Sequence, residues 1–212
     1  MIVLSHVLNE KTPLYGGAKG LEFRPAKSIA AGDSCNTMTW ALSNHAGTHM
    51  DAPRHFVDKG ASVTDIPAGD WMFQRPVLKD IMPVEAGYLV GPEDFDDLKD
   101  GDFLLIKSGF EEYRPENLYW ENAPGLHKDL AAFLKERMPS LRAVGMDFIS
   151  VSNINNREMG RAAHQAFLGA EILLIEDMKL SVLTKPPQRV LVAPVLVERA
   201  DGSPCTVFAW DQ

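Results

Sequence analysis

Half of the histidines in this chain lie in one short stretch that also carries an aspartate. Residues 45–55 contain His45, His49, Asp51 and His55, out of six histidines in 212 residues. Imidazole nitrogen and carboxylate oxygen together suit zinc, manganese or iron(II) better than calcium or magnesium, which prefer oxygen alone. Burying several titratable groups without a metal or a partner is costly. The stretch therefore predicts a binding site for a divalent metal.

The backbone that presents these side chains is predicted to be irregular. Gly47 and Pro53 argue against a helix, and Ala46 stands where the zinc-protease helix requires a glutamate. We expect the end of a strand to turn into a loop, with Gly47 permitting close backbone approach. The alternative is a surface cluster without a ligand, since a single histidine is usually a satisfied core residue.

His55 allows two interpretations beside such a metal. Three nitrogens and one oxygen complete a structural site, whereas a catalytic site keeps a position open. A histidine with a pKa near 6.5 is also the most suitable general acid or base at neutral pH. His55 is therefore either a further ligand or the acid/base, and the residue types alone leave both open.

Further candidates lie downstream and near the N-terminus. His164 falls near the end of a helix predicted over residues 157–168, and Glu176 directly follows a predicted apolar strand. Charged groups at the end of a buried strand often lie in a cleft, although a solvated strand terminus explains Glu176 equally well. Asp147, within a hydrophobic strand, is a candidate for a group that supports a ligand. Tyr15 lies in a proline- and glycine-rich loop, where it either lines a pocket or packs on the surface.

The hydrophobic pattern predicts a mixed α/β fold that would position these residues. Strands are predicted at residues 2–8, 37–43, 77–81, 103–107, 143–149, 171–175, 190–197 and 206–210, and helices at 92–98, 125–138 and 157–168. Met38, Trp40 and Leu42 alternate in the strand that leads to His45, so we expect that strand to be half buried. The last two strands are expected to pair as a hairpin. With no linker or repeat, one domain over residues 1–212 is predicted.

Composition excludes several classes of partner. The net charge of −8 and the absence of lysine or arginine runs argue against nucleic acid. No apolar run approaches the roughly 20 residues that span a bilayer, and the N-terminus lacks the features of a signal peptide. Cys35 and Cys205 belong to no motif, which favours free thiols in a reducing compartment. We therefore expect a cytoplasmic protein that acts on a small molecule.

The histidine-rich stretch resembles the signature of the cyclase-like metal-dependent hydrolases, a family that includes bacterial kynurenine formamidase and isatin hydrolase. The resemblance continues through residues 101–106, 144–147 and 164–176 and ends at residues 201–204, so it covers nearly the whole chain. It implies a swivelling β/β/α fold and a homo-oligomer, either a dimer or a tetramer.

The formamidase branch of this family also implies a site for two divalent metal ions, zinc foremost and manganese as an alternative. By position, the ligands would be His45, His49, Asp51, His164 and Glu176. The first ion would take all of these except His164, and the second would take the last two together with Asp51. Asp51 and Glu176 would then bridge the ions, and His55 would be the acid/base. Other members bind one metal, often manganese.

The resemblance favours hydrolysis of N-formyl-L-kynurenine to kynurenine and formate, with Tyr15 as a wall for the aromatic ring. A divalent metal lowers the pKa of water from 15.7 toward about 7, and His55 would pass a proton to the leaving nitrogen. The chain departs from the formamidases at residues 15–18 and at Ser152 and Asn153, where substrate choice would be set. The alternatives are a hydrolase of another cyclic amide or a lactone, and a non-catalytic metal-binding protein of the same fold.

Overall fold

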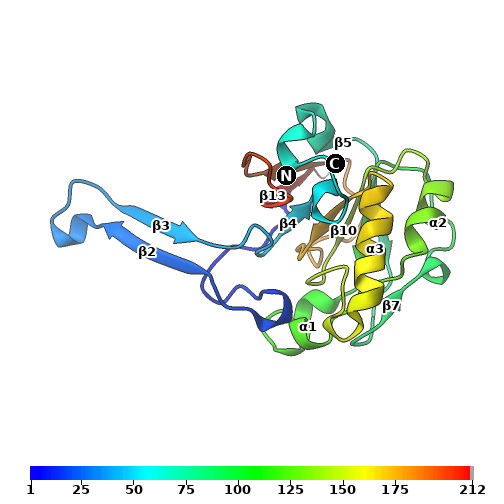
Figure 1. Cartoon of the computed structure of the whole chain (residues 1–212), viewed down its shortest axis with the longest axis horizontal. Coiled ribbons are helices and arrows are strands. Elements are labelled where there is room, and N and C mark those ends of the chain that lie inside the picture. Colours follow the sequence, from blue (N-terminus) through cyan, green and yellow to red (C-terminus); the bar gives the residue numbers. More distant parts are fainter. Residues whose placement is uncertain (211–212) are drawn as a thin grey trace.

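A computed structural model of the chain, which describes residues 1–210, contains one large mixed sheet of nine strands (Figure 1). The strands are β1 (Ile2–Val3), β4 (His49–Asp51), β5 (Met72–Phe73), β6 (Pro76–Asp80), β8 (Phe103–Lys107), β10 (Ala143–Met146), β11 (Leu173–Glu176), β12 (Arg189–Pro194) and β13 (Gly202–Trp210). Their order is β5-β12-β13-β4-β11-β10-β8-β6, and β1 also pairs with β13. The predicted mixed α/β class is confirmed.

The short strand β4 lies in the middle of this sheet and joins its two parts. β6, β8, β10 and β11 run parallel, as is usual where helices cover a sheet. β4 is antiparallel both to β11 and to β13. Because β4 has hydrogen-bonded neighbours on both sides, the side chains of His49 and Asp51 start from a firmly held backbone.

Helices α2 (Leu130–Arg137) and α3 (Arg157–Gly169) lie against one face of the sheet (Figure 1). Successive residues of the buried strand β8 supply the cores on the two faces. Leu104 and Ile106 join the core beneath the helices, whereas Phe103 and Leu105 join the core on the other face, with the residues of β12 and β13. The continuous apolar run at 103–107 therefore marks a strand that is buried on both sides.

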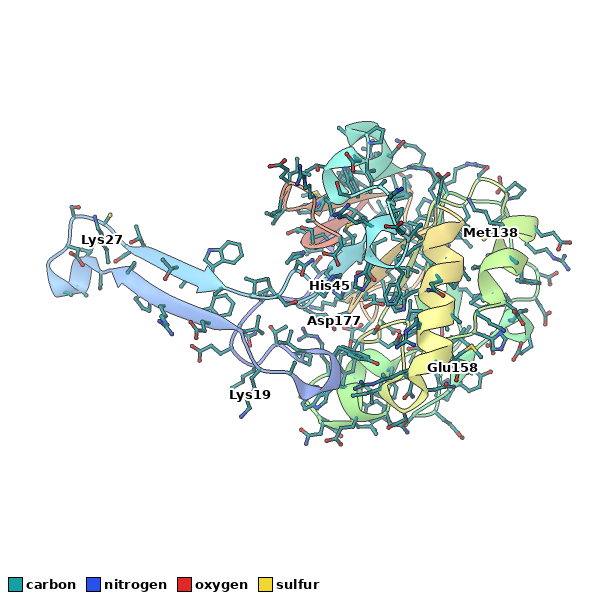
Figure 2. The ribbon with its side chains drawn as sticks, viewed as in Figure 1. Lys19, Lys27, His45, Met138, Glu158 and Asp177 are labelled. Carbon is teal, nitrogen blue, oxygen red and sulfur yellow. The ribbon has the colours of Figure 1, made fainter. Side chains whose placement is uncertain are left out.

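Strands β2 (Glu22–Lys27) and β3 (Thr37–Ala41) form a hairpin that projects from the rest of the molecule, and we call residues 18–41 the arm (Figures 1 and 2). In its register, Trp40 pairs with Phe23 and Met38 pairs with Pro25, which gives the arm one apolar face. Trp40 is 56% exposed and Met38 57% exposed. The strand was predicted correctly, but the expected half-burial is wrong, because the strand leaves the body of the molecule instead of lying on it.

The remaining elements are short. α1 spans Leu118–Glu121, and β7 (Leu89–Val90) pairs with β9 (Gly125–Leu126). Because β9 occupies its start, the helix predicted at 125–138 begins only at Leu130, and the helix predicted at 92–98 is a single 3-10 turn, Pro92–Asp94. Further 3-10 turns are Tyr15–Gly17, Ile29–Ala31, Pro53–His55, Val63–Asp65, Ala68–Trp71, Phe110–Tyr113 and Ile154–Asn156.

Two other expectations are tested by the structure. The hairpin of the last two strands is confirmed as the antiparallel pair β12–β13, and both cysteines are free. Within residues 1–210, no helix has the length and apolar character needed to cross a membrane.

Candidate metal centre

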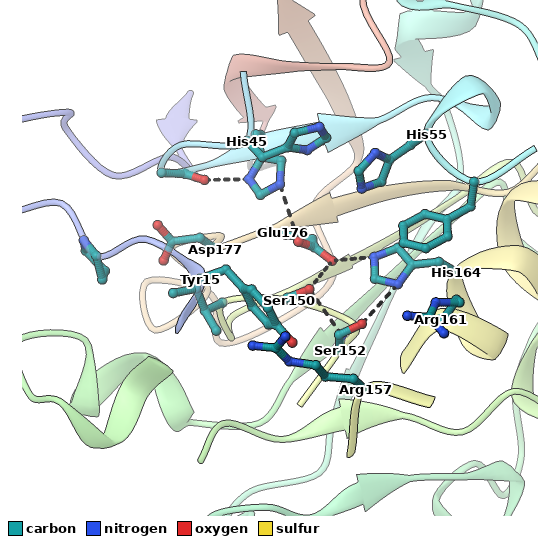
Figure 3. Close-up of a pocket in the computed structure, with 15 residues that line it drawn as sticks. Tyr15, His45, His55, Ser150, Ser152, Arg157, Arg161, His164, Glu176 and Asp177 are labelled. Atoms are coloured by element: carbon teal, nitrogen blue, oxygen red, sulfur yellow. Dashed lines mark hydrogen bonds and ion pairs between the residues drawn. The ribbon is translucent and has the colours of Figure 1, made fainter. Parts of the chain in front are cut away.

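The residues predicted as metal ligands meet where β4, β11 and α3 come together. Figure 3 shows three of them, His45, His164 and Glu176, beside the cavity. His49 and Asp51 are two residues apart on β4 and therefore point to the same face of the sheet. Glu176 ends β11 and is the register partner of His49. His164 reaches the same place from α3. The sequence separation of more than a hundred residues between β4 and β11 is thus closed by strand pairing.

His49, Asp51, His164 and Glu176 form a buried group that we call the inner cluster. The Nε2 atom of His49 lies 3.6 Å from Asp51 Oδ1 and 3.3 Å from Glu176 Oε2. The Nε2 atom of His164 lies 3.6 Å from Asp51 Oδ2 and 3.5 Å from Glu176 Oε1. All four side chains are at most 5% exposed. Each imidazole therefore faces both carboxylates.

The backbone fixes which ring nitrogen each imidazole turns toward the centre. Nδ1 of His49 is 2.8 Å from the carbonyl oxygen of Gly47, and Nδ1 of His164 is 2.8 Å from that of Gly160. An Nδ1–H that donates to a carbonyl leaves the Nε2 lone pair free, as in metal-binding histidines. The left-handed backbone of Gly47, at φ 63°, makes the turn that brings its carbonyl back to His49.

The carboxylates of Asp51 and Glu176 are held in a geometry that suits a cation. Oδ2 of Asp51 is buried and has no hydrogen-bond partner among the described residues, which is unusual for a native protein. Oε1 of Glu176 is held by the backbone N–H of Val151 at 2.7 Å and by the hydroxyl of Ser150 at 3.1 Å. Two imidazole nitrogens and two fixed carboxylates around one point fit zinc or another divalent metal of intermediate softness.

The pKa values describe the charge balance of the inner cluster. Burial lowers the pKa of both imidazoles, but contacts with Glu176 and Asp51 outweigh burial and raise the pKa of His49 to about 9 and of His164 to about 10. Burial and the charge of Asp51 raise the pKa of Glu176, yet its bonds to His164 and His49 lower it to about 2. Two protonated imidazoles thus balance two carboxylates, and a divalent cation would replace those two protons at equal charge.

His45, His55 and Asp201 form a second group at the mouth of the site, which we call the outer cluster. Nδ1 of His55 is 2.8 Å and Nε2 of His45 is 3.0 Å from the same oxygen, Asp201 Oδ2. The two imidazole rings lie 4.2 Å apart. Their side chains are 26% and 23% exposed. Burial lowers the pKa of His55 below its usual value, so His55 is neutral at pH 7.

His45 connects the two clusters. Its Nδ1 atom is 2.9 Å from Asp51 Oδ1, while its other ring nitrogen contacts Asp201. His45, His49 and Asp51 each offer a ligand atom, and these atoms lie within 4.8 Å of one another. The five residues predicted as metal ligands therefore come together, with His45 on the outer side of the group.

Asp201 is a member of the site that the sequence pattern does not reveal. Its position before Gly202 indicates only a turn. In the structure, this turn packs closely against the site. A Cβ at residue 202 would clash with the ring of His45 and would lie 2.9 Å from the carbonyl oxygen of Met50. A glycine is required for this close approach, and the carboxylate before it is thereby placed between two imidazoles.

Asp147 and the Ser152–Asn153 departure have separate outcomes. The Asp147 carboxylate accepts hydrogen bonds from the backbone N–H groups of Ser108 and Gly109, both at 2.9 Å, and so holds a loop instead of a ligand. The hydroxyl of Ser152 lies 3.3 Å from His164 Nδ1 and lines the cavity. Asn153 is buried. Of these two residues, Ser152 is the one that lines the cavity.

A cavity of about 480 Å³ opens beside the inner cluster (Figure 3). Tyr15 lines it, as the pocket interpretation of that residue expects, and Phe56 stacks on the His164 ring at 4.4 Å. Two arginines that the sequence reasoning passed over, Arg157 and Arg161, also line this cavity. They lie four residues apart on the predicted helix, and Arg161 is three residues before His164. Residues at this spacing share one helix face, so the sequence could have indicated that both arginines lie on the side of His164.

Comparison with known proteins identifies the family of the chain. The model of the Cyclase family matches residues 2–153, which is more than half of the chain. The chain belongs to the cyclase family. It is 26% identical over 205 residues to a kynurenine formamidase of Bacillus mycoides, covering 96% of this chain and 93% of that protein.

Solved structures show the same fold. Isatin hydrolase A from Labrenzia aggregata superposes with a TM-score of 0.84 at 20% identity, over 100% of this chain and 93% of that one. A potential metal-dependent hydrolase with cyclase activity gives a TM-score of 0.76 at 23% identity, over 100% and 97% of the two chains. The resemblance to cyclase-like metal-dependent hydrolases, and with it the prediction of an enzyme, is confirmed.

Proposed function

We propose that this chain hydrolyses the amide bond of an acylated aromatic amine, with N-formyl-L-kynurenine as the leading substrate. One observation carries the proposal. Two buried imidazoles turn their Nε2 atoms toward the carboxylates of Asp51 and Glu176, and Oδ2 of Asp51 has no hydrogen-bond partner among the described residues. The likeness to kynurenine formamidase over 96% of the chain supports the choice of bond.

The inner cluster and His45 would hold the metal. Five ligands, of which Asp51 and Glu176 each present two oxygens, are enough for two ions, and we propose zinc, with manganese as the alternative. Bound there, a divalent cation lowers the pKa of water toward about 7 and polarises a carbonyl oxygen.

The outer cluster would move the proton. His55 is neutral at pH 7, and one of its ring nitrogens lies within 4.8 Å of ligand atoms of Asp51 and His164. Asp201 accepts a hydrogen bond from Nδ1 of His55 and so orients the ring. His55 would take a proton from the attacking water and deliver it to the nitrogen of the leaving amine. Tyr15 would form a wall for the aromatic ring of the substrate.

A substrate panel tests this function. Metal-loaded protein is assayed with N-formyl-L-kynurenine, isatin and a set of lactones, and the proposal expects the formamide to have the highest kcat/KM. Preference for isatin or a lactone would favour the isatin hydrolase-like alternative, for which the fold of Labrenzia aggregata isatin hydrolase A is the supporting observation. Bound metal without hydrolysis of any member would mean a non-catalytic binding protein.

The predicted cytoplasmic location remains a prediction. We also propose that the chain forms a homo-oligomer through its arm. An isolated two-stranded hairpin is marginal in water, yet the apolar face with Met38 and Trp40 is exposed. The arm carries three basic and two acidic residues and therefore has a net charge of +1. Because the whole chain has a net charge of −8, the residues outside the arm have a net charge of −9. A second copy thus offers the arm a surface of opposite charge.

Light scattering after size exclusion tests the oligomer. The wild type is expected to have at least twice the mass of one chain, and Trp40→Glu is expected to shift that mass toward one chain. Arg199→Glu, an exposed change outside the arm, serves as the control. A wild-type mass of one chain over a wide range of concentrations would contradict the proposal.

A further inference from the structure

We propose that Arg157 binds a carboxylate of the substrate at the end of the cavity remote from the bond that is cleaved, and that Arg161 assists from one helical turn nearer to His164. This inference rests on the proposed hydrolase function and names the class of substrate: an acylated aromatic amine that carries an acid group on a side chain. Neutral amides, cyclic or open, would be poor substrates.

Both arginines share a helix face with a predicted metal ligand. Arg157, Arg161 and His164 are spaced four and three residues apart on α3, which places them along one side of the helix. All three line the cavity, whereas Glu158 and Gln165 of the same helix do not. Arg157 and Arg161 are also exposed to solvent, so the cavity is open where they line it. The helix thus places two solvent-accessible cations and a predicted metal ligand along the cavity.

Neither arginine has an anionic partner within the described chain. Five of the ten arginines pair with carboxylates of the described residues; for example, Arg114 contacts Asp177 at 2.8 Å and Arg75 contacts Asp100 at 3.0 Å. Among residues 1–210, no carboxylate lies within ion-pair distance of Arg157 or Arg161, although the chain has 29 acidic residues. A guanidinium that lines a cavity without a partner can bind a carboxylate through two parallel hydrogen bonds.

Tyr15 adds a neutral donor at the same end of the cavity. In Figure 3, the Arg157 side chain extends toward the Tyr15 ring, away from His55. Burial raises the pKa of Tyr15, with a smaller opposing effect of Arg157, so its hydroxyl stays protonated and can donate. A hydroxyl beside a guanidinium is a suitable pair for one carboxylate group.

The length of the helix sets the size of the substrate. Arg157 and His164 are seven residues apart, which corresponds to about 10 Å along the helix axis. An amide at the inner cluster and a carboxylate at Arg157 must therefore be separated by several bonds. A formylated aromatic amine with an amino-acid side chain has this shape, whereas isatin is short and uncharged.

The test compares two substrates with the same scissile bond, N-formyl-L-kynurenine and formanilide, of which only the first has a carboxylate. Arg157→Gln is expected to raise KM for N-formyl-L-kynurenine about 10- to 100-fold, and thereby to reduce the ratio of the two kcat/KM values at least tenfold. Arg161→Gln is expected to do the same to a smaller extent, and Arg157→Lys to retain part of the preference. Arg137→Gln, on α2 and outside the cavity lining, is the matched control.

An unchanged ratio in both Arg157→Gln and Arg161→Gln would overturn the inference, as would an equal loss with both substrates. Binding of kynurenine, measured by calorimetry, separates this inference from the proposed function because binding requires no turnover. If the wild type hydrolyses neither substrate but binds kynurenine in a way that Arg157→Gln abolishes, the proposed function fails and the carboxylate site stands. If kynurenine binds equally to wild type and Arg157→Gln, the carboxylate site fails.

Discussion

The inner and outer clusters each combine two histidines with carboxylates, two in the inner cluster and one in the outer, but they differ in burial and in their partners. In the inner cluster, His49 and His164 each donate Nδ1–H to a backbone carbonyl and are almost fully buried. In the outer cluster, His45 and His55 share the carboxylate of Asp201, which is 38% exposed. Hydrogen bonds to backbone carbonyls fix the imidazole rings of the inner cluster. In the outer cluster, the histidines and Asp201 are partly exposed, so a proton on them can exchange with solvent.

This difference assigns two tasks to one histidine-rich stretch. Contact with two carboxylates raises the pKa of His49 and His164, so these groups hold a positive charge or a metal at pH 7. Burial with weaker compensation lowers the pKa of His55, so this group is free to accept a proton. Burial alone thus does not decide the task, since the number of facing carboxylates sets the sign of the shift.

The largest effect is expected from Asp51→Asn in the inner cluster. Loss of this carboxylate removes a ligand that faces both imidazoles, so bound metal should disappear and turnover should fall below roughly a thousandth of the wild type. Elemental analysis and a turnover assay check this result. Asp147→Asn, an equally buried change outside the site, should retain the metal. Metal retained by Asp51→Asn would contradict the assignment of the inner cluster.

His55→Ala in the outer cluster is expected to reduce kcat by about 10²- to 10⁴-fold, as for the loss of a general acid or base. Its metal content should remain that of the wild type, because His55 hydrogen-bonds to Asp201 and to neither inner carboxylate. The two measurements are made on the same preparation. Loss of metal in this variant would place His55 among the ligands and erase the distinction between the clusters.

Asp201→Asn is expected to have a smaller effect, a loss of about 10- to 100-fold in kcat, since it acts through the histidines that it orients. The Asp201 hydrogen bond raises the pKa of His55, so its weakening lowers that pKa. The acid limb of the pH–kcat profile should therefore move to lower pH. A shift to higher pH, or no change in kcat, would show that Asp201 does not orient His55.

The smallest effect is on the pH dependence of stability in protein stripped of metal. His49 and His164 have pKa values near 9 and 10, above the 6.5 of an unfolded histidine. Their stabilising contribution is fully present below pH 6.5 and is lost as the pH rises through 9 to 10. Thermal unfolding from pH 6 to 10 should show this decline without metal and a weaker one with zinc bound, while zinc affinity rises over the same range. Equal slopes with and without zinc would contradict the assignment.

The sequence was most informative where local pattern and chemistry coincide. The run at 103–107 is β8 as predicted, and the residues predicted as ligands lie together. The helix predicted at 157–168 places His164 correctly. These features depend on short-range hydrophobic pattern or on residue types that have one common chemical use.

Features that depend on long-range contacts were missed. β4 has only three residues and exists because β11 and β13 bind it from both sides, so no local signal marks it. Asp201 joins the site through the close approach of Gly202 to His45. Trp40 belongs to an alternating pattern that is typical of a half-buried strand, yet it lies on an exposed arm. Alternation shows that one face of a strand is apolar, but it does not show which part of the molecule packs against that face.

The central claim is that the inner cluster holds a divalent metal on which hydrolysis depends. Elemental analysis of the purified protein, before and after chelation, combined with turnover of N-formyl-L-kynurenine, tests it most directly. The account predicts about two metal ions per chain, loss of turnover as the metal is removed, and recovery when zinc or manganese is restored. Full turnover by protein that contains less than about a tenth of an ion per chain would contradict it.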